Sequence, residues 1–137
     1  MQSNTKSVLF AITMLFSSLA SSNEIITEVL LKSTINLKVE FGKPASLYPV
    51  IFKNKACTFQ GEASLNSGNH RVDINLTSKS CNGTSTPING LVSAIDGKAG
   101  LPVKCKDAYT NSVGNKLCAE ANLTSGTVAT VIGTLDR

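Results

Sequence analysis

The clearest pattern in the chain is His70-Arg71-Val72-Asp73-Ile74-Asn75-Leu76-Thr77, in which polar and apolar side chains alternate from Arg71 onward. Successive side chains of a β-strand point to opposite faces, so Val72, Ile74 and Leu76 are expected to share one buried face. The residues before this strand, 65–69, have turn chemistry (Leu-Asn-Ser-Gly-Asn). We therefore expect residues 56–64 to pair back with the strand as a β-hairpin.

The same alternation occurs in residues 34–41, Thr-Ile-Asn-Leu-Lys-Val-Glu-Phe, and Gly42-Lys43-Pro44 ends it. Less regular strands are expected at 25–32 (or a short helix there), 47–59, 88–95, 101–106 and 127–135. Pro49 indicates that its strand lies at an edge or contains a bulge. Asp107–Ala121 is the best helix candidate, although Gly114 weakens it. Short strands separated by Gly and Asn turns predict a mainly β fold, as a small sandwich or a partly closed β-barrel with one short helix.

The first 22 residues have the composition of a secretory signal peptide. Lys6 precedes the apolar residues 7–16, and small residues dominate 17–22. This apolar run is shorter than the roughly 20 residues that span a membrane, although an uncleaved anchor is the alternative. We therefore expect residues 1–22 to be a signal peptide and 23–137 to be a single β-rich exported domain.

Four cysteines follow that segment: Cys57, Cys81, Cys105 and Cys118. An even number of cysteines in an exported chain predicts disulfides, whereas a zinc site is disfavoured because no CxxC pair occurs. Three pairings are open. We favour Cys57–Cys81 with Cys105–Cys118, because each closes a short loop.

Neither composition nor motifs indicate catalysis. The chain contains no GxSxG elbow, HExxH motif or P-loop. Its one histidine, His70, has no partner fixed by spacing and is expected to be a surface residue. We predict no catalytic, cofactor-binding or metal-binding residue and no cofactor, so the chain is expected not to be an enzyme; a small secreted hydrolase is the alternative.

The charge does not indicate a nucleic-acid partner. The formal net charge is only +4, and the chain has two Tyr and no Trp to stack on bases. Three sequons, at Asn75, Asn82 and Asn122, are candidates for glycosylation only if the chain is secreted by a eukaryote.

Residues 47–101 carry a resemblance to a known family. Its pieces are Ala-Cys-Thr-Phe-Gln-Gly at 56–61, a strand at 71–81 that closes with Ser-Cys, Pro-Ile-Asn-Gly-Leu-Val at 87–92, and Asp-Gly-Lys-Ala-Gly-Leu at 96–101. In order and approximate spacing they resemble the C-terminal domain of the TraB/TrbI proteins, scaffolds of conjugative type IV secretion. The resemblance implies a β-barrel domain that forms a ring at the outer membrane, and it also supports pairing Cys57 with Cys81.

That family continues into an apolar helical hairpin, for which Asp107–Ala121 is too polar. We therefore expect a non-enzymatic component of the periplasm or outer membrane that assists assembly of a type IV secretion or pilus apparatus. Its expected partners are envelope, secretion or pilus proteins, with a ring-forming oligomer and outer-membrane association implied by the resemblance. The alternative is a secreted protein-binding module, either an inhibitor or an adhesin.

Overall fold

The computed structural model describes residues 24–40 and 42–135, in which ten strands and no helix are present. The predicted signal peptide, 1–22, and Phe41 lie outside the described residues. The strands are β1 (Glu24–Leu31), β2 (Ile35–Lys38), β3 (Tyr48–Lys53), β4 (Cys57–Asn66), β5 (Arg71–Cys81), β6 (Thr84–Ser93), β7 (Leu101–Pro102), β8 (Cys105–Thr110), β9 (Lys116–Leu123) and β10 (Val128–Leu135).

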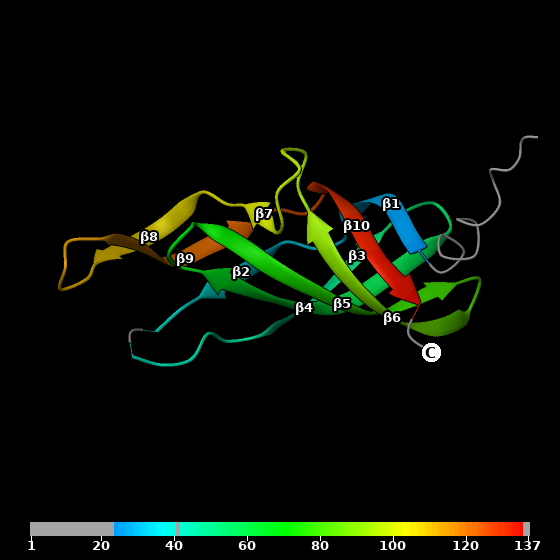
Figure 1. The fold of residues 1–137 in the computed structure, drawn as a ribbon, viewed down its shortest axis with the longest axis horizontal. Helices are drawn as coiled ribbons and strands as arrows, with labels where there is room; N and C mark the ends of the chain where they lie inside the picture. Colours follow the sequence, from blue (N-terminus) through cyan, green and yellow to red (C-terminus); the bar gives the residue numbers. More distant parts are fainter. Residues whose placement is uncertain (1–23, 41, 136–137) are drawn as a thin grey trace, which may run out of the picture.

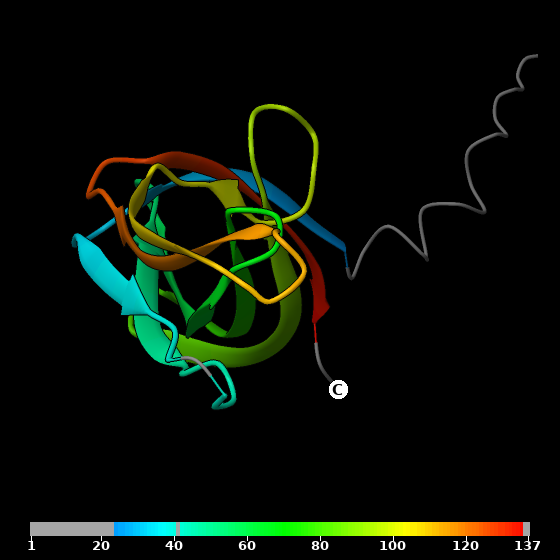
Figure 2. The same cartoon turned by 90° about the vertical axis from the view of Figure 1, so that its left-hand side faces the viewer.

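Seven strands form one antiparallel sheet in the order β4-β3-β1-β10-β6-β5-β7, and β4 pairs with β5 as well. That additional pairing makes the sheet partly ringed rather than a barrel (Figures 1 and 2). The ring is weakest between β1 and β3, which pair only through Leu30, Leu31 and their partners. A second sheet, β2-β9-β8, extends to the left in Figure 1. The mainly β prediction is confirmed.

The core fills the inside of the curled sheet and continues into the second sheet, where Leu37 and Ala121 are fully buried. Val72, Ile74 and Leu76 are all buried, as their alternation predicts. Phe52 on β3 lies opposite Phe59 on β4, and both side chains are fully buried. Burying such a side chain contributes about 1.5–3 kcal/mol, so this aromatic pair is a main contribution to stability.

The long β4–β5 hairpin is confirmed, and it is bent where its register shifts between Gln60 and Gly61. A Cβ atom at Gly61 would collide with the backbone of Asn75 and Leu76 on β5. Glycine therefore permits the close strand approach at this bulge, which turns the hairpin toward the rest of the ring.

The helix prediction for Asp107–Ala121 is wrong, because this segment forms most of the β8–β9 hairpin. Residues 111–115, Asn-Ser-Val-Gly-Asn, make the turn. The Asn111 side chain accepts hydrogen bonds from the backbone N–H groups of Val113 and Asn115, at 3.1 and 2.9 Å, and Gly114 has φ 88°. This turn chemistry overrides the helix propensity of the flanking Lys, Ala and Glu residues.

The structure also differs from the prediction of one strand at 101–106. Only Leu101 and Pro102 form β7, and β7 pairs with Arg71 and Val72 of β5. The chain then crosses to the second sheet.

Both favoured disulfides are present. Cys57 and Cys81 are direct partners across β4 and β5, and a second disulfide joins Cys105 to Cys118. None of the described residues belongs to a helix that could cross a membrane.

Candidate protein-docking face

The outer surface of β1, β10 and β6 carries apolar side chains in register. Ile26 on β1 lies opposite Ile132 on β10, which lies opposite Leu91 on β6. These side chains are exposed by 66%, 47% and 56%, respectively. Three large apolar residues therefore form one continuous row across three strands.

A second row lies four residues further along β1 and β10. Leu30 is opposite Val128, with exposures of 41% and 39%, and Glu28 and Thr130 separate the rows. We call the five residues Ile26, Leu30, Leu91, Val128 and Ile132 the apolar ladder. They are five of the eight large apolar side chains that are exposed among the described residues, so exposed apolar area is concentrated on this one face.

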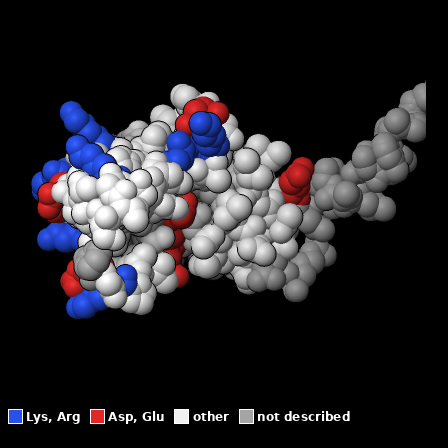
Figure 3. All heavy atoms as spheres, turned by 60° about the vertical axis from the view of Figure 1, so that its left-hand side comes forward, with Lys and Arg blue, Asp and Glu red and all other residues white. Residues whose placement is uncertain are grey.

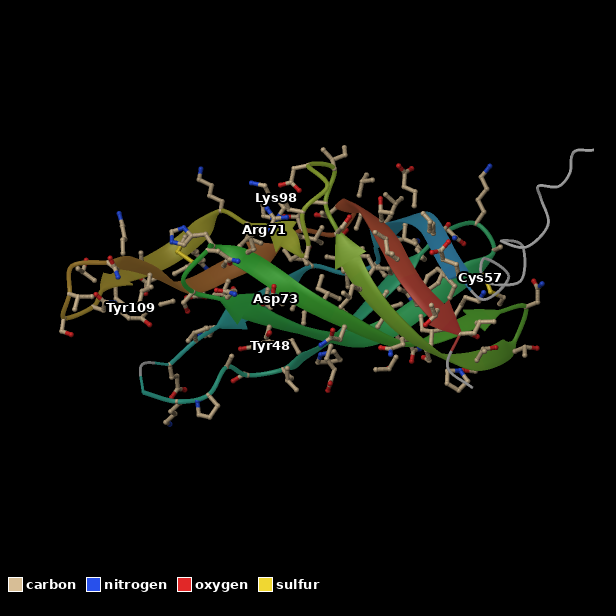
Figure 4. The ribbon with its side chains drawn as sticks, in the orientation of Figure 1. Tyr48, Cys57, Arg71, Asp73, Lys98 and Tyr109 are labelled. Carbon is tan, nitrogen blue, oxygen red and sulfur yellow. A yellow bond between two sulfur atoms is a disulfide. The ribbon has the colours of Figure 1, made fainter. Side chains whose placement is uncertain are left out.

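The loop between β6 and β7 rises beside this face and presents a further apolar side chain. Ile95 is 92% exposed, and together with Val128 it lines a hollow at the base of the loop. Figure 4 shows that the Arg71 side chain points from β5 into this loop.

Arg71 holds the loop in place. Its Nε donates to the carbonyl of Ala99 at 3.0 Å, and its Nη2 donates to those of Lys98 and Gly100 at 3.3 and 3.0 Å. Its Nη1 pairs with the Asp96 carboxylate at 2.9 Å. Because the planar, rigid guanidinium binds the loop at several points, it anchors the loop that carries Ile95 to the sheet.

The carboxylate of Asp96 is held in its charged form. Hydrogen bonds from Arg71 and from the backbone N–H of Lys98 lower the pKa of Asp96 below its ordinary value of 3.8. The Arg71–Asp96 pair therefore persists at neutral pH.

A second ionic group lies on the other sheet, away from the ladder. The side chain of Asn36 donates to Glu120 at 2.9 Å, and Lys106 lies 3.6 Å away. The Asn36 hydrogen bond, followed by the charge of Lys106, lowers the pKa of Glu120. Lys and Arg gather at this end of the molecule in Figure 3, whereas much of the surface to its right is uncharged.

The predicted site residues are structural. The four cysteines lie in hairpin strands and form the two disulfides. His70 is at the β4–β5 turn with φ 56°, and its carbonyl accepts a hydrogen bond from Val103. Within residues 24–40 and 42–135, no group of three or more His, Cys, Asp or Glu is arranged to hold a metal. The sequon asparagines Asn75, Asn82 and Asn122 are all exposed.

Sequence reasoning missed the apolar ladder, although a signal for it exists. Ile25-Ile26, Leu91-Val92 and Val131-Ile132 are adjacent apolar pairs in strands of one sheet. Since neighbouring residues of a strand face opposite ways, one member of each pair must point outward. The buried members are Ile25, Val92 and Val131, and the exposed members form the first row.

Comparisons of the chain with protein-family models, curated proteins and solved structures found no match.

Proposed function

We propose that this chain is an exported, non-enzymatic protein-binding component of the cell envelope, which docks other proteins on the apolar ladder. The in-register row Ile26–Ile132–Leu91 carries the proposal. Contiguous exposed apolar area on a small domain is typical of an interaction surface.

The exported location is supported by the two disulfides, which are compatible with an oxidising periplasmic or extracellular compartment. The resemblance of residues 47–101 to the TraB/TrbI domain directs the proposal to envelope machines. On this basis the chain assists assembly of a type IV secretion or pilus apparatus in the periplasm or at the outer membrane. Its partners there are envelope, secretion or pilus proteins, and a ring of several copies is one form of the assembly.

A secreted inhibitor or adhesin is the second candidate. The observation that favours it is the self-contained fold: a buried core and two disulfides lie within the one chain, so no partner is needed to complete the domain. In that case the ladder docks a soluble or surface target outside the cell.

Fractionation of cells that express the tagged protein, with cross-linking and identification of partners, distinguishes the envelope assembly component from the secreted module. Recovery in a large envelope complex with secretion or pilus proteins supports the assembly role. Recovery as a free monomer in the medium contradicts that role and favours the secreted module.

Substitutions inside and outside the apolar ladder test whether partner binding depends on the ladder. We expect Leu91→Ser and Ile132→Ser to abolish partner cross-linking. Leu47→Ser and Val113→Ser are the controls, because they remove apolar side chains outside the ladder that are even more exposed (61% and 76%). Equal loss of cross-linking in all four variants would contradict docking on the ladder.

A further inference from the structure

Strand β1 has an open edge. It pairs with β10 along Glu24–Leu30, but on its other side only Leu30 and Leu31 have partners, in β3. Among the described residues, Glu24 to Val29 therefore lack a strand neighbour on that side. An unpaired edge of this kind can accept an additional strand.

The hydrogen-bonding pattern shows which backbone groups face the open side. Leu31 N–H donates to Thr127 at the β10 side, whereas Lys32 N–H donates to Ile51 of β3. The β1–β10 register contains no bulge. Because backbone groups alternate along a strand, Glu24, Ile26 and Glu28 direct their N–H and C=O groups to the open edge.

The space beside this edge is accessible at one end. A hollow of about 460 Å³ lies where β1 and β3 part, lined by Glu28, Val29, Leu30 and residues 53–55. Beyond Lys53 the chain turns away to begin β4. A strand entering here would continue the line of β3.

Three other strand edges are protected, and Pro49 leaves the free side of β3 without a backbone donor at that position. The Tyr48 hydroxyl occupies the edge of β2: it accepts a hydrogen bond from Lys38 N–H at 3.0 Å and lies 3.4 Å from the Lys38 carbonyl. Strand β8 has two register shifts at Asp107, with Lys104 just before the strand and Lys106 within it, and both features discourage pairing. Strand β7 has only two residues.

The side chains along the open edge define the partner. Glu24, Ile26 and Glu28 all point to the outer face, and Ile26 ends the first row of the apolar ladder at the open side. No described basic residue forms an ion pair with either glutamate, and Lys53 and Lys55 line the hollow without pairing with Glu28. An added strand would therefore place an apolar residue opposite Ile26 and basic residues opposite the two glutamates.

We infer that β1 binds an extended segment of another protein with the alternation basic-x-apolar-x-basic, by strand addition. This inference rests on the proposed protein-binding function and specifies how that function works. A second copy of the chain fits less well. The antiparallel register that places Ile26 opposite its own copy also places Glu24 opposite Glu28 twice, and facing like charges are destabilising.

The test uses the protein purified after export with both disulfides formed. Its probe is the fluorescein-labelled peptide Thr-Lys-Thr-Ile-Thr-Lys-Thr, and its control is the same peptide with Glu in place of Lys. We expect fluorescence anisotropy to show about tenfold tighter binding of the Lys peptide at low salt, with amide NMR shifts confined to residues near 24–28. The double variant Glu24→Lys/Glu28→Lys should invert the preference.

Ile26→Pro removes a backbone N–H that points to the open edge, so the backbone hydrogen bonds between β1 and β10 are kept. It should abolish binding of the Lys peptide, whereas Ile26→Val, which keeps the N–H and a branched apolar side chain, should bind it almost normally. Thermal melting shows whether Ile26→Pro is folded. If it is not, the inverted peptide preference of the Glu24→Lys/Glu28→Lys variant tests the inference without it.

Equal binding of both peptides, no binding of either, or dimerisation through β1 would overturn the inference. If Leu91→Ser and Ile132→Ser lose the cellular partner but Ile26→Pro keeps it, strand addition is wrong and the docking function stands. If none of these variants changes cross-linking, the docking function itself is wrong.

Discussion

Arg71 on β5 binds Asp96 across 25 positions of sequence, and Nη1 lies 2.9 Å from Oδ2. The Arg71 side chain is only 13% exposed and also donates to three backbone carbonyls of the loop. We expect Arg71→Ala to lower the free energy of unfolding by about 2 kcal/mol, because these acceptors lose their partner. Urea denaturation measures the change.

Arg71→Lys should restore less than half of that loss, since an ammonium group cannot supply the planar fork. The control is Lys106→Ala, which breaks an ion pair whose lysine is 59% exposed and should cost less than about 1 kcal/mol. If Arg71→Ala costs no more than Lys106→Ala, the loop is not held as described.

The Asp96 carboxylate gives stability a defined pH dependence. Because folding lowers the pKa of Asp96, its contribution is fully present above the unfolded-state value of about 3.8 and is lost as the pH falls through the folded-state value. We expect wild type to exceed Asp96→Asn in stability at neutral pH, and the difference to shrink below pH 3.8. Denaturation curves from pH 7 down to 2 test this, and parallel curves for the two proteins would show that Asp96 is not responsible.

The Cys57–Cys81 disulfide joins residues 24 positions apart. In the chain-entropy model a link of this length contributes about 3 kcal/mol, so we expect the double variant Cys57→Ser/Cys81→Ser to lose about that amount. The urea midpoint of the oxidised protein is the measurement. Reducing agent should lower the midpoint of wild type and should lower that of the double variant less, since only Cys105–Cys118 is left to reduce.

Gly133 on β10 lies opposite Gly90 on β6, where the strands approach closely. A Cβ atom at Gly133 would lie 2.6 Å from the Asn89 carbonyl oxygen and 2.7 Å from the Gly90 Cα. We expect Gly133→Ala to destabilise the fold by about 1–3 kcal/mol, as other overpacked substitutions do. Gly68→Ala is the matched control, because its Cβ would meet only Asn66 Oδ1 at 3.7 Å, and it should melt almost like wild type.

Much of the β architecture could be predicted from local patterns. The alternation at 71–77 identified β5 and its buried face, and the turn at 65–69 identified its hairpin with β4. Pro49 was expected at an edge or a bulge, and it lies in β3, which β1 flanks only at Phe52 and Lys53. The helix prediction at 107–121 is wrong because the turn formed around Asn111 and Gly114 outweighs the helix propensity of the flanking residues.

The candidate site could not be predicted in the same way. The apolar ladder depends on three strands, from opposite ends of the chain, being aligned in register, and local periodicity does not fix which strands become neighbours. The open edge of β1 depends on the point at which β3 turns away, which is a property of the folded sheet and not of either strand's sequence. The two disulfides, by contrast, follow from spacing because each joins the strands of one hairpin.

The edge of β2 is protected by the Tyr48 hydroxyl, which hydrogen-bonds the backbone of Lys38, and this limits how the protein can assemble at high concentration. Of the edges of the described strands, that of β1 (Glu24–Val29) is the one proposed to accept an added strand, so the protein can end a growing fibre but cannot extend it. We therefore expect complexes of fixed one-to-one stoichiometry rather than filaments when the partner is in excess.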